Sequence, residues 1–365
     1  MDQTADGTAD GTGDGIGVVL VTYATGDVVL DCLDALRAAA RHPGAPPLKV
    51  VVVDNLSPDG TRARLEAWAE RTGVRLAASD LREGPAPVPG PLAEDHVALV
   101  QSGENRGFAA GVNHGLRVLE ADPATRWFWV LNSDALTAPH TPAVLARAAR
   151  AAEAEAPFGA LGGRLFLTEP PLTIQTDGGA IDWATGRLFP ANAGRTGHDV
   201  PGPARPEYIC GGHMLVSRDF LAAAGPMPEE WFLYFEEVDW ILRAPHLPLA
   251  FVPGAEVHHV GGASIGSDKG GGKRGGGKKG GGGPSALAAY WMFRNRLRFV
   301  DRHGRPRRRG AMATAWAFGA AKVAQLAKRR HWAAARAAAR GMRDYARHDR
   351  PLEAARRREG EPSSN

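Results

Sequence analysis

Residues 48–60 read LKVVVVDNLSPDG, and this stretch indicates the fold class. Its first six residues are mostly β-branched, as expected of a strand that is buried on both faces of a sheet. A second such run, GVVLVTY, spans residues 17–23, and residues 28–41 between the two carry apolar side chains at helical spacing. Further expected helices and strands follow over residues 61–72, 97–101, 108–120, 127–131 and 141–156. This alternation predicts an α/β fold with a Rossmann-like, mostly parallel sheet and helices on both faces.

The remainder of the chain is less regular. The proline-rich residues 80–96 predict a surface insertion, and short β-like pieces run from residue 159 to 204. Helical patterns return over residues 287–302 and 311–347. We therefore expect five parts, namely a disordered tail (1–15), an α/β domain (16–265), a flexible Gly/Lys-rich linker (266–284), a helical region (285–348) and a second disordered tail (349–365).

The composition favours a cytoplasmic protein. Hydrophobic residues make up 44% of the 365-residue chain, enough to fill a sizeable core. With only two cysteines, Cys32 and Cys210, a disulfide framework is not expected. The acidic, polar first fifteen residues do not resemble a signal peptide, and no stretch approaches the roughly 20 apolar residues of a membrane-spanning helix.

The net charge of +4 hides an asymmetry along the chain. From residue 284 onward there are 20 Lys and Arg against 6 Asp and Glu. Such a basic helical extension predicts a negatively charged partner, such as the inner face of a plasma membrane. The alternative is docking against the α/β domain or against a second subunit of a homo-oligomer. Nucleic acid is not an expected partner, because no recognised binding motif accompanies the charge.

Polar side chains follow the second expected strand. Ligands of open parallel sheets bind just outside the carboxyl ends of the strands, so Asp54 is placed to accept a hydrogen bond from a base or ribose. Its neighbours Asn55, Ser57 and Asp59 could instead shape a turn and cap the next helix. The small residues of ENRGFAAGVNHG (104–115) would let a helix start approach a diphosphate, or let that helix pack tightly against strands.

Candidate metal ligands follow two later strands. WFWVLNSDAL (127–136) delivers Asn132 and Asp134 at the end of a strand, where a carboxylate can hold Mg²⁺ or Mn²⁺ against a diphosphate. Taken alone, an Asp in this position is as often a helix N-cap. The adjacent His258 and His259 would face opposite ways along a strand, so at most one of them is an expected ligand.

A cluster of acids and aromatic residues provides a candidate base. EEWFLYFEEVDWILR (229–243) places Glu236, Glu237 and Asp239 beside four large aromatic side chains. A partly buried setting raises the pKa of a carboxylate and suits it to general-base catalysis. The alternative is that Glu236 or Asp239 caps the helix or pairs with Arg243.

Taken together and in this order, these segments resemble the family 2 glycosyltransferases of the GT-A fold, most closely the bacterial rhamnosyltransferase-like members. The matching pieces are VTY (21–23), VVVDNLSPDG (51–60), NRGFAAGVN (105–113), VLNSDA (130–135), GGHMLVSRDF (211–220), WFLYFEEVDWILR (231–243), HVGGAS (259–264) and YWMFRNRLRF (290–299). The resemblance covers residues 16–300 and implies a GT-A α/β domain, followed here by the helical basic extension.

The resemblance also implies roles for single residues. Asp54 would contact the nucleobase, Asp134 and His259 would hold Mg²⁺ or Mn²⁺, and Glu237 would be the catalytic base. The other residues expected on the donor side are Thr22, Tyr23, Asn55, Asn105, Gly107, Asn113 and Asn132. The other residues expected on the acceptor side are Trp231, Glu236 and Asp239.

The sequence departs from the family pattern at three places. Ala24 stands where an Asn often follows VTY, and the DxD element is reduced to Asn132-Ser133-Asp134. Glu237 stands where the family usually has an Asp, so its side chain is one methylene longer.

The implied reaction is the inverting, metal-dependent transfer of a sugar from a nucleotide-diphosphate donor, with dTDP-L-rhamnose favoured. The acceptor would be a hydroxyl of a glycan or polyprenyl-linked glycan in cell-envelope or polysaccharide synthesis. A sugar nucleotidylyltransferase is one alternative, but GVVLVTYATGD (17–27) lacks the usual glycine-rich phosphate loop with a basic residue. A degenerate, non-catalytic sugar-nucleotide-binding protein is another, and the presence of Asp134, Glu237 and His259 argues against it.

Overall fold

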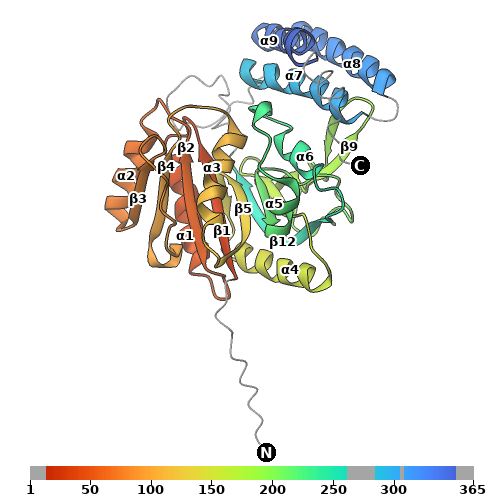
Figure 1. Cartoon of the computed structure of the whole chain (residues 1–365). Helices are drawn as coiled ribbons and strands as arrows, with labels where there is room; N and C mark the ends of the chain where they lie inside the picture. The colour runs from red at the N-terminus through yellow and green to blue at the C-terminus, as the bar shows by residue number, and fades with distance from the viewer. Residues whose placement is uncertain (1–13, 261–283, 305–307, 351–365) are drawn as a thin grey trace, which may run out of the picture.

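The computed structural model describes residues 14–260, 284–304 and 308–350, and it confirms the α/β class (Figure 1). A ten-stranded sheet has the strand order β3-β4-β2-β1-β5-β11-β7-β12-β6, with β8 paired to β7. Its strands are β1 (Gly15–Thr22), β2 (Leu48–Asp54), β3 (Arg75–Asp80), β4 (His96–Gln101), β5 (Thr125–Asn132), β6 (Ala135–Thr137), β7 (Ala160–Leu167), β8 (Thr173–Thr176), β11 (His213–Ser217) and β12 (Leu249–His259). A separate hairpin consists of β9 (Gly179–Asp182) and β10 (Arg187–Pro190).

Helices cover both faces of the sheet. Alternate residues of β1 point to opposite sides, so that Val18 and Leu20 belong to one apolar cluster and Val19 and Val21 to the other. The first cluster includes side chains of α1 (Val28–Ala40), α2 (Thr61–Thr72) and α4 (Thr141–Glu155). The second includes side chains of α3 (Phe108–Glu120), α5 (Arg218–Ala224) and α6 (Glu236–Ile241).

The sheet is parallel except where β11, β6 and β8 enter it. Strands β1 to β5 run parallel wherever they pair, and β12 runs parallel to β7. Between these groups β11 is antiparallel to both β5 and β7. The start of β11 therefore lies at the same edge as the carboxyl ends of β1, β2, β5 and β12. This edge collects the polar residues that the sequence singled out.

Two local expectations were incomplete. The predicted insertion over residues 80–96 is flanked by an edge strand, β3, that its polar sequence RLAASD did not reveal. The helix predicted over 311–347 is two helices, α8 (Arg308–Lys328) and α9 (Trp332–Asp344), because Arg330 adopts a positive φ of 62° between them. A π-helical turn, Tyr345–Asp349, follows α9.

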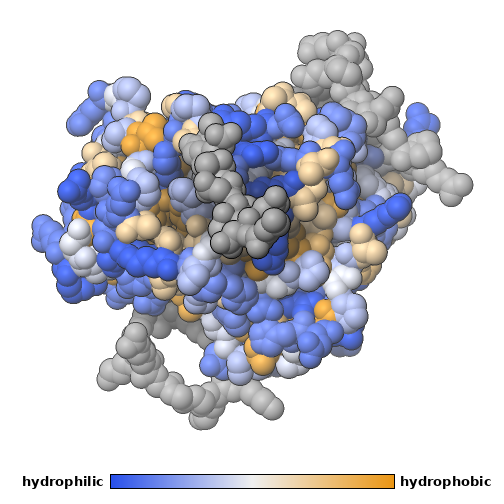
Figure 2. Space-filling view, turned by 90° about the horizontal axis from the view of Figure 1, so that it is seen from below, coloured by the Kyte–Doolittle hydropathy of each residue, from blue (hydrophilic) through white to orange (hydrophobic). Residues whose placement is uncertain are grey.

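The expected linker and tails lie almost wholly outside the described residues, and the division of the chain into these parts stays a prediction. The helical region itself is present. Helices α7 (Ala286–His303), α8 and α9 pack on one another above the carboxyl edge of the sheet (Figure 1). Within the described ranges, none of the helices combines the length and apolarity needed to cross a bilayer. The face opposite these helices is mostly hydrophilic, with scattered hydrophobic side chains (Figure 2).

Helices α7 and α9 approach each other closely at Gly341. A Cβ at this position would overlap the carbonyl oxygen of Tyr290, at a distance that real Cβ atoms do not reach. We therefore expect Gly341→Ala to push α9 away from α7 and lower the free energy of unfolding by about 1–3 kcal/mol. Chemical denaturation monitored by circular dichroism measures the change.

The matched control for this prediction is Gly310→Ala in α8, where an added Cβ meets no atom within 4 Å. That change should leave stability equal or raise it by up to about 1 kcal/mol. Equal effects of the two substitutions would contradict the close packing of α7 on α9.

Candidate active site

The predicted site residues converge on the carboxyl edge of the sheet. Thr22 and Asp54 end β1 and β2, Asn132 ends β5, and His259 ends β12. Asp134 is joined to this edge by the hydrogen bond from the N–H of Val260 to its carbonyl oxygen (2.9 Å). Strand order, rather than proximity in the sequence, thus brings these residues together.

Asp134 and His259 are in direct contact. The His259 Nε2 atom lies 2.9 Å from Asp134 Oδ1 and 3.2 Å from the Asn132 amide nitrogen, and Asp134 is only 2% exposed. The other ring nitrogen of His259 donates to the amide oxygen of Gln175 at 2.8 Å. With Nδ1–H donating in this way, the ring turns Nε2 towards the Asp134 carboxylate, where a proton or a cation can lie between the two atoms.

This arrangement fits a divalent cation. A carboxylate oxygen and an imidazole nitrogen are suitable ligands for Mn²⁺ or Mg²⁺, and an outer hydrogen bond such as that to Gln175 is usual for a ligating His. Within residues 14–260, 284–304 and 308–350, no group of three His, Cys, Asp or Glu side chains could hold a metal. Of the described residues, Asp134 and His259 would be ligands, with substrate oxygens and water completing the coordination, as is common for Mg²⁺ sites. His258 points away and stacks on Phe166, with ring centroids 5.2 Å apart.

Glu236 and Glu237 begin α6 at the same edge. Burial raises the pKa of Glu237, although nearby backbone N–H groups, including that of Gly211, oppose the shift. Burial, together with the charge of Glu237, raises the pKa of Glu236 well above its usual range. The Glu236 Oε2 atom is buried without a hydrogen-bond partner, whereas the Glu237 side chain keeps part of its surface exposed. Two adjacent carboxyls of this kind favour a state in which one is neutral while the other accepts a proton.

The glycine pair Gly211–Gly212 connects the acidic helix to the candidate metal ligands. A Cβ at Gly211 would lie 3.3 Å from the Cβ of Glu237, and a Cβ at Gly212 would lie 3.0 Å from the Asn132 amide nitrogen. The N–H of Asn132 also donates to the carbonyl of Gly212 at 3.1 Å. Glu237 and the Asn132–His259 pair therefore flank two consecutive residues.

Other predicted donor-side residues divide into two groups. Asp54 is 1% exposed, and its carboxylate accepts from the backbone N–H of Ser57 (3.1 Å) and the side-chain amide of Gln101 (2.9 Å). Tyr23 is 38% exposed, whereas Thr22 is buried and its hydroxyl contacts that of Thr25. The nucleobase contact of Asp54 stays a prediction, since its carboxylate already has protein partners.

The second group, Asn55, Asn105, Gly107 and Asn113, packs against the segment that leads to and contains the acidic residues, residues 227–239, called the acidic segment below. The Asn113 side chain accepts from the N–H of Met227 (2.8 Å) and donates to the Met227 carbonyl (2.9 Å), and Asn55 donates to the carbonyl of Gly107 (2.9 Å). Gly107 has a φ of 92°, and a Cβ there would overlap the carbonyl oxygen of Phe232. Asn105 accepts from the Gly107 N–H at 3.0 Å. These contacts favour tight packing of the α3 start against the acidic segment, the alternative that the sequence left open.

Asp239 and Trp231 lie inside the protein. Trp231 is fully buried, and its indole N–H donates to Asp239 Oδ2 at 2.9 Å. The same carboxylate accepts from Arg302 (2.9 Å) and from the ring of His303 (2.6 Å), both at the end of α7. Burial raises the pKa of Asp239, but the hydrogen bond from His303 and the charge of Arg302 outweigh it and hold that pKa well below its usual range. These positions favour a structural role over the predicted acceptor contact.

Several site residues had no assigned role at the level of sequence. They are Gln175, Gly211, Gly212, Asn295, Arg302 and His303. Gly211, Gly212 and Asn295 fall within the quoted GGHMLVSRDF and YWMFRNRLRF segments, and Arg302 and His303 follow the second segment closely. The match of these two segments to the family was the one sequence feature that pointed to them. Gln175 had none, because it lies in an irregular strand.

Comparison with known protein families gives one match. Residues 17–164 match the model of the family described as Glycosyl transferase family 2. This part of the chain is therefore similar to a family 2 glycosyltransferase domain. The predictions of a glycosyltransferase and of its α/β fold are thereby confirmed. The matched residues include β1 to β6, with Asp54 and Asp134, whereas Glu237 and His259 lie beyond them. No curated protein sequence matches the chain significantly.

Solved structures resemble this glycosyltransferase at low sequence identity. The mannosyltransferase PcManGT from Pyrobaculum calidifontis, in complex with GDP-Man and Mn²⁺, has a TM-score of 0.49 and 16% identity over 90% of this chain and 86% of its own. TarS 1–349 from S. aureus, in complex with UDP-GlcNAc, has a TM-score of 0.44 and 14% identity over 83% of this chain and 71% of its own. Likenesses of this degree assign neither a donor nor an acceptor.

The Asp239 network should contribute strongly to the stability of the glycosyltransferase. We expect Asp239→Asn to lower the free energy of unfolding by about 3–5 kcal/mol at neutral pH, because it removes the buried carboxylate charge that Arg302 and His303 both contact. Since the folded-state pKa of Asp239 is depressed, its stabilisation is present at neutral pH and is lost as the pH falls towards that value. Urea unfolding of both proteins across an acidic pH series measures both effects.

The control is Glu66→Gln, which removes a surface pair with Arg62 one helical turn away. Both side chains are nearly half exposed, so the change should stay within about 0.5 kcal/mol. An Asp239→Asn protein as stable as this control would contradict the assigned network.

Proposed function

We propose that this glycosyltransferase catalyses the inverting, metal-dependent transfer of a sugar from a nucleotide-diphosphate donor to an acceptor hydroxyl. The observation that carries the proposal is the pairing of Asp134 with His259 on one side of Gly211–Gly212 and the placement of Glu237 on the other. Both groups lie where ligands of open α/β sheets bind.

Asp134 and His259 would hold Mg²⁺ or Mn²⁺ against the donor diphosphate. When bound, such a cation neutralises the negative charge that develops on the leaving diphosphate. The Nδ1–H of His259 donates to Gln175, so the ring is oriented with Nε2 free for the cation before substrate arrives.

Glu237 would act as the general base. It accepts the proton of the acceptor hydroxyl while that oxygen attacks the anomeric carbon from the face opposite the diphosphate, so the configuration inverts in a single displacement. Its raised pKa brings the carboxylate closer to the basicity that proton transfer at neutral pH requires. The buried Glu236 beside it would remain neutral, which keeps a second negative charge out of the site.

The donor is proposed to be dTDP-L-rhamnose, with UDP-sugars next, on the resemblance of the sequence motifs. Asp54 would read the nucleobase, with Gln101 and Ser57 holding its carboxylate. Tyr23 is exposed beside the end of β1, where a base could lie against its ring. The nucleotidylyltransferase alternative has less support, because residues 17–164 match the model of a glycosyltransferase family.

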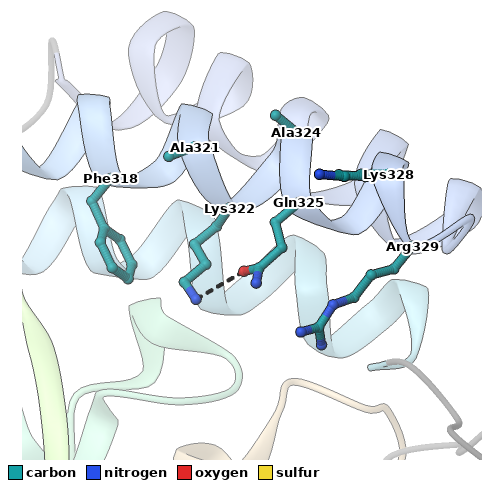
Figure 3. A pocket seen from close by; sticks show the side chains of 7 residues that line it. All are labelled: Phe318, Ala321, Lys322, Ala324, Gln325, Lys328 and Arg329. Atoms are coloured by element: carbon teal, nitrogen blue, oxygen red, sulfur yellow. Dashed lines mark hydrogen bonds between the residues drawn. The ribbon is translucent and has the colours of Figure 1, made fainter.

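The acceptor is proposed to be a glycan or polyprenyl-linked glycan met at the inner face of a membrane. Helix α8 carries a shallow hollow lined by Phe318, Lys322, Gln325 and Arg329, which extend from the same side of the helix (Figure 3). Lys328 at the end of α8 and Arg329 and Arg330 in the turn after it are exposed, and Trp332 follows at 56% exposure. Cations beside an exposed Trp suit the surface of an anionic membrane.

Two substitutions separate donor binding from transfer. Asp134→Asn should weaken metal-dependent binding of nucleotide diphosphate, because it removes the charged ligand. Glu237→Gln should leave that binding intact and lower kcat by about 10²–10⁴-fold, because it removes the base. A hydrolysis screen of dTDP-, UDP- and GDP-sugars with Mg²⁺ and Mn²⁺ measures turnover, and calorimetry with dTDP, UDP and GDP measures binding.

The pH profile supplies a further check on Glu237. Its raised pKa predicts that kcat increases with pH through a limb above the usual Glu range, and that Glu237→Gln loses this limb. The control is Asp219→Asn, because Asp219 is an exposed carboxylate in the first turn of α5, at the opposite edge of the sheet. It should change neither kcat nor its pH dependence. Donor binding that does not depend on the metal would contradict the role of Asp134, and near-normal turnover of Glu237→Gln would move the base to Glu236.

Membrane association is tested by vesicle sedimentation. The wild-type protein should bind phosphatidylglycerol vesicles more tightly than phosphatidylcholine vesicles, with each basic residue contributing about 1 kcal/mol. Arg329→Glu with Arg330→Glu should weaken binding to the anionic vesicles by at least about tenfold. Arg195→Glu, an exposed arginine in the loop after β10, should not. Equal binding to both vesicle types, or a stable dimer in its place, would reject the membrane proposal.

A further inference from the structure

One face of α7 is bound to the segment that carries the acidic residues. Asn295, Arg298 and Arg302 recur at helical spacing and contact residues 230–239. Arg298 donates to the carbonyl of Glu230 at 2.8 Å, and the guanidinium of Arg302 lies 5.0 Å from the ring centre of Trp231. The helical extension is therefore docked against the glycosyltransferase domain at its candidate active site.

The segment that α7 contacts has a strained backbone. Phe232, Tyr234 and Phe235 have φ values of 63°, 69° and 74°, in the left-handed region that large side chains rarely adopt. Such a conformation persists only where the surrounding structure imposes it, and it is found most often at functional sites. Glu236 and Glu237 follow directly, so the path of this turn sets where the Glu237 carboxylate lies.

Asn295 holds this turn from inside the protein. Its side-chain amide donates to the carbonyls of Trp231 (2.8 Å), Leu233 (2.8 Å) and Tyr234 (3.0 Å). The side chain is completely buried. The carbonyl at the end of a 3-10 helical turn (Glu229–Trp231) and two carbonyls of the following bend thus converge on one donor group. From the other side, the N–H of Phe108 donates to the carbonyl of Phe232 at 2.9 Å.

We propose that Asn295 is a positioning residue of the transfer reaction. Its amide fixes the turn at residues 231–235, and the turn thereby aims the Glu237 carboxylate at the acceptor hydroxyl. The inference rests on the proposed function of Glu237 as the base. It assigns a part of the helical extension to the chemistry and predicts that kcat, and not donor affinity, depends on this amide.

The test uses the full chain with Asn295→Asp, which preserves size but replaces the donating NH₂ with an oxygen. We expect kcat for hydrolysis of the dTDP-, UDP- or GDP-sugar that the wild-type protein turns over to fall by about 10- to 100-fold, because misplacing the base slows proton transfer. The Kd of the matching nucleotide diphosphate with Mn²⁺ should stay within about twofold, since Asp134 and His259 are held by other elements.

A pH series supplies a readout that a merely structural role would not move. The ratio of kcat for Asn295→Asp to kcat for the wild-type protein should rise as the pH is lowered. Protonation of the introduced carboxylate restores one O–H donor towards the carbonyls. Asn295→Ser has no carboxylate at this position, and its ratio to the wild-type kcat should not show this rise. A ratio that does not change with pH would contradict the role of this side chain as a donor.

Two further variants keep the result interpretable. Arg294→Gln breaks the ion pair of α7 with Asp349 (2.7 Å) and leaves the hydrogen bonds of Asn295 in place, so it should lower stability while kcat per folded molecule stays at the wild-type value. Asn295→Ser keeps a single hydroxyl donor on a shorter side chain and adds no charge. If Asn295→Asp does not fold, the same kcat and Kd measurements on Asn295→Ser test the inference. Wild-type kcat in the folded Asn295 variants, or an equal loss in Arg294→Gln, would overturn the inference. Near-normal turnover of Glu237→Gln would instead overturn the proposed role of Glu237.

Discussion

The antiparallel strand β11 is the constraint on which the rest of the site depends. Strands β1, β2 and β5 are parallel, so by themselves they would place only strand ends and helix starts at their carboxyl edge. Because β11 runs the other way between β5 and β7, the chain arrives at that edge before entering the strand. Its approach is the glycine pair Gly211–Gly212, which lets Asn132 and Glu237 come close from either side.

Electrostatics then separates three acidic residues that are neighbours in the sequence. Asp239 is buried among Arg302, His303 and Arg243 and stays ionised, so it serves as an anchor. Glu236 and Glu237 lie at the start of the same helix without comparable cations, and their pKa values rise. A single turn of helix thus contains one carboxylate with a lowered pKa, which holds structure together, and two carboxyls with raised pKa values.

The helical extension is part of the same arrangement. Its first helix, α7, supplies hydrogen bonds and cations to residues 230–239, while α8 and α9 cover α7 from outside. Docking against the domain, which was one interpretation of the amphipathic pattern, accounts for α7. The exposed cations after α8 lie beyond that contact.

The sequence by itself determined the fold class and the strand-end positions of the polar residues over 17–164, because buried strands, helical periodicity and strand-end polar residues are local patterns. Asp54, Asn132 and Asp134 follow their strands directly and could be placed at one edge without coordinates. Only the tertiary structure decided the partners of His259, the anchoring role of Asp239 and the contact of Asn295 with the acidic turn. Each of these joins residues about 60 or more positions apart through side-chain geometry, and neither periodicity nor spacing encodes such contacts.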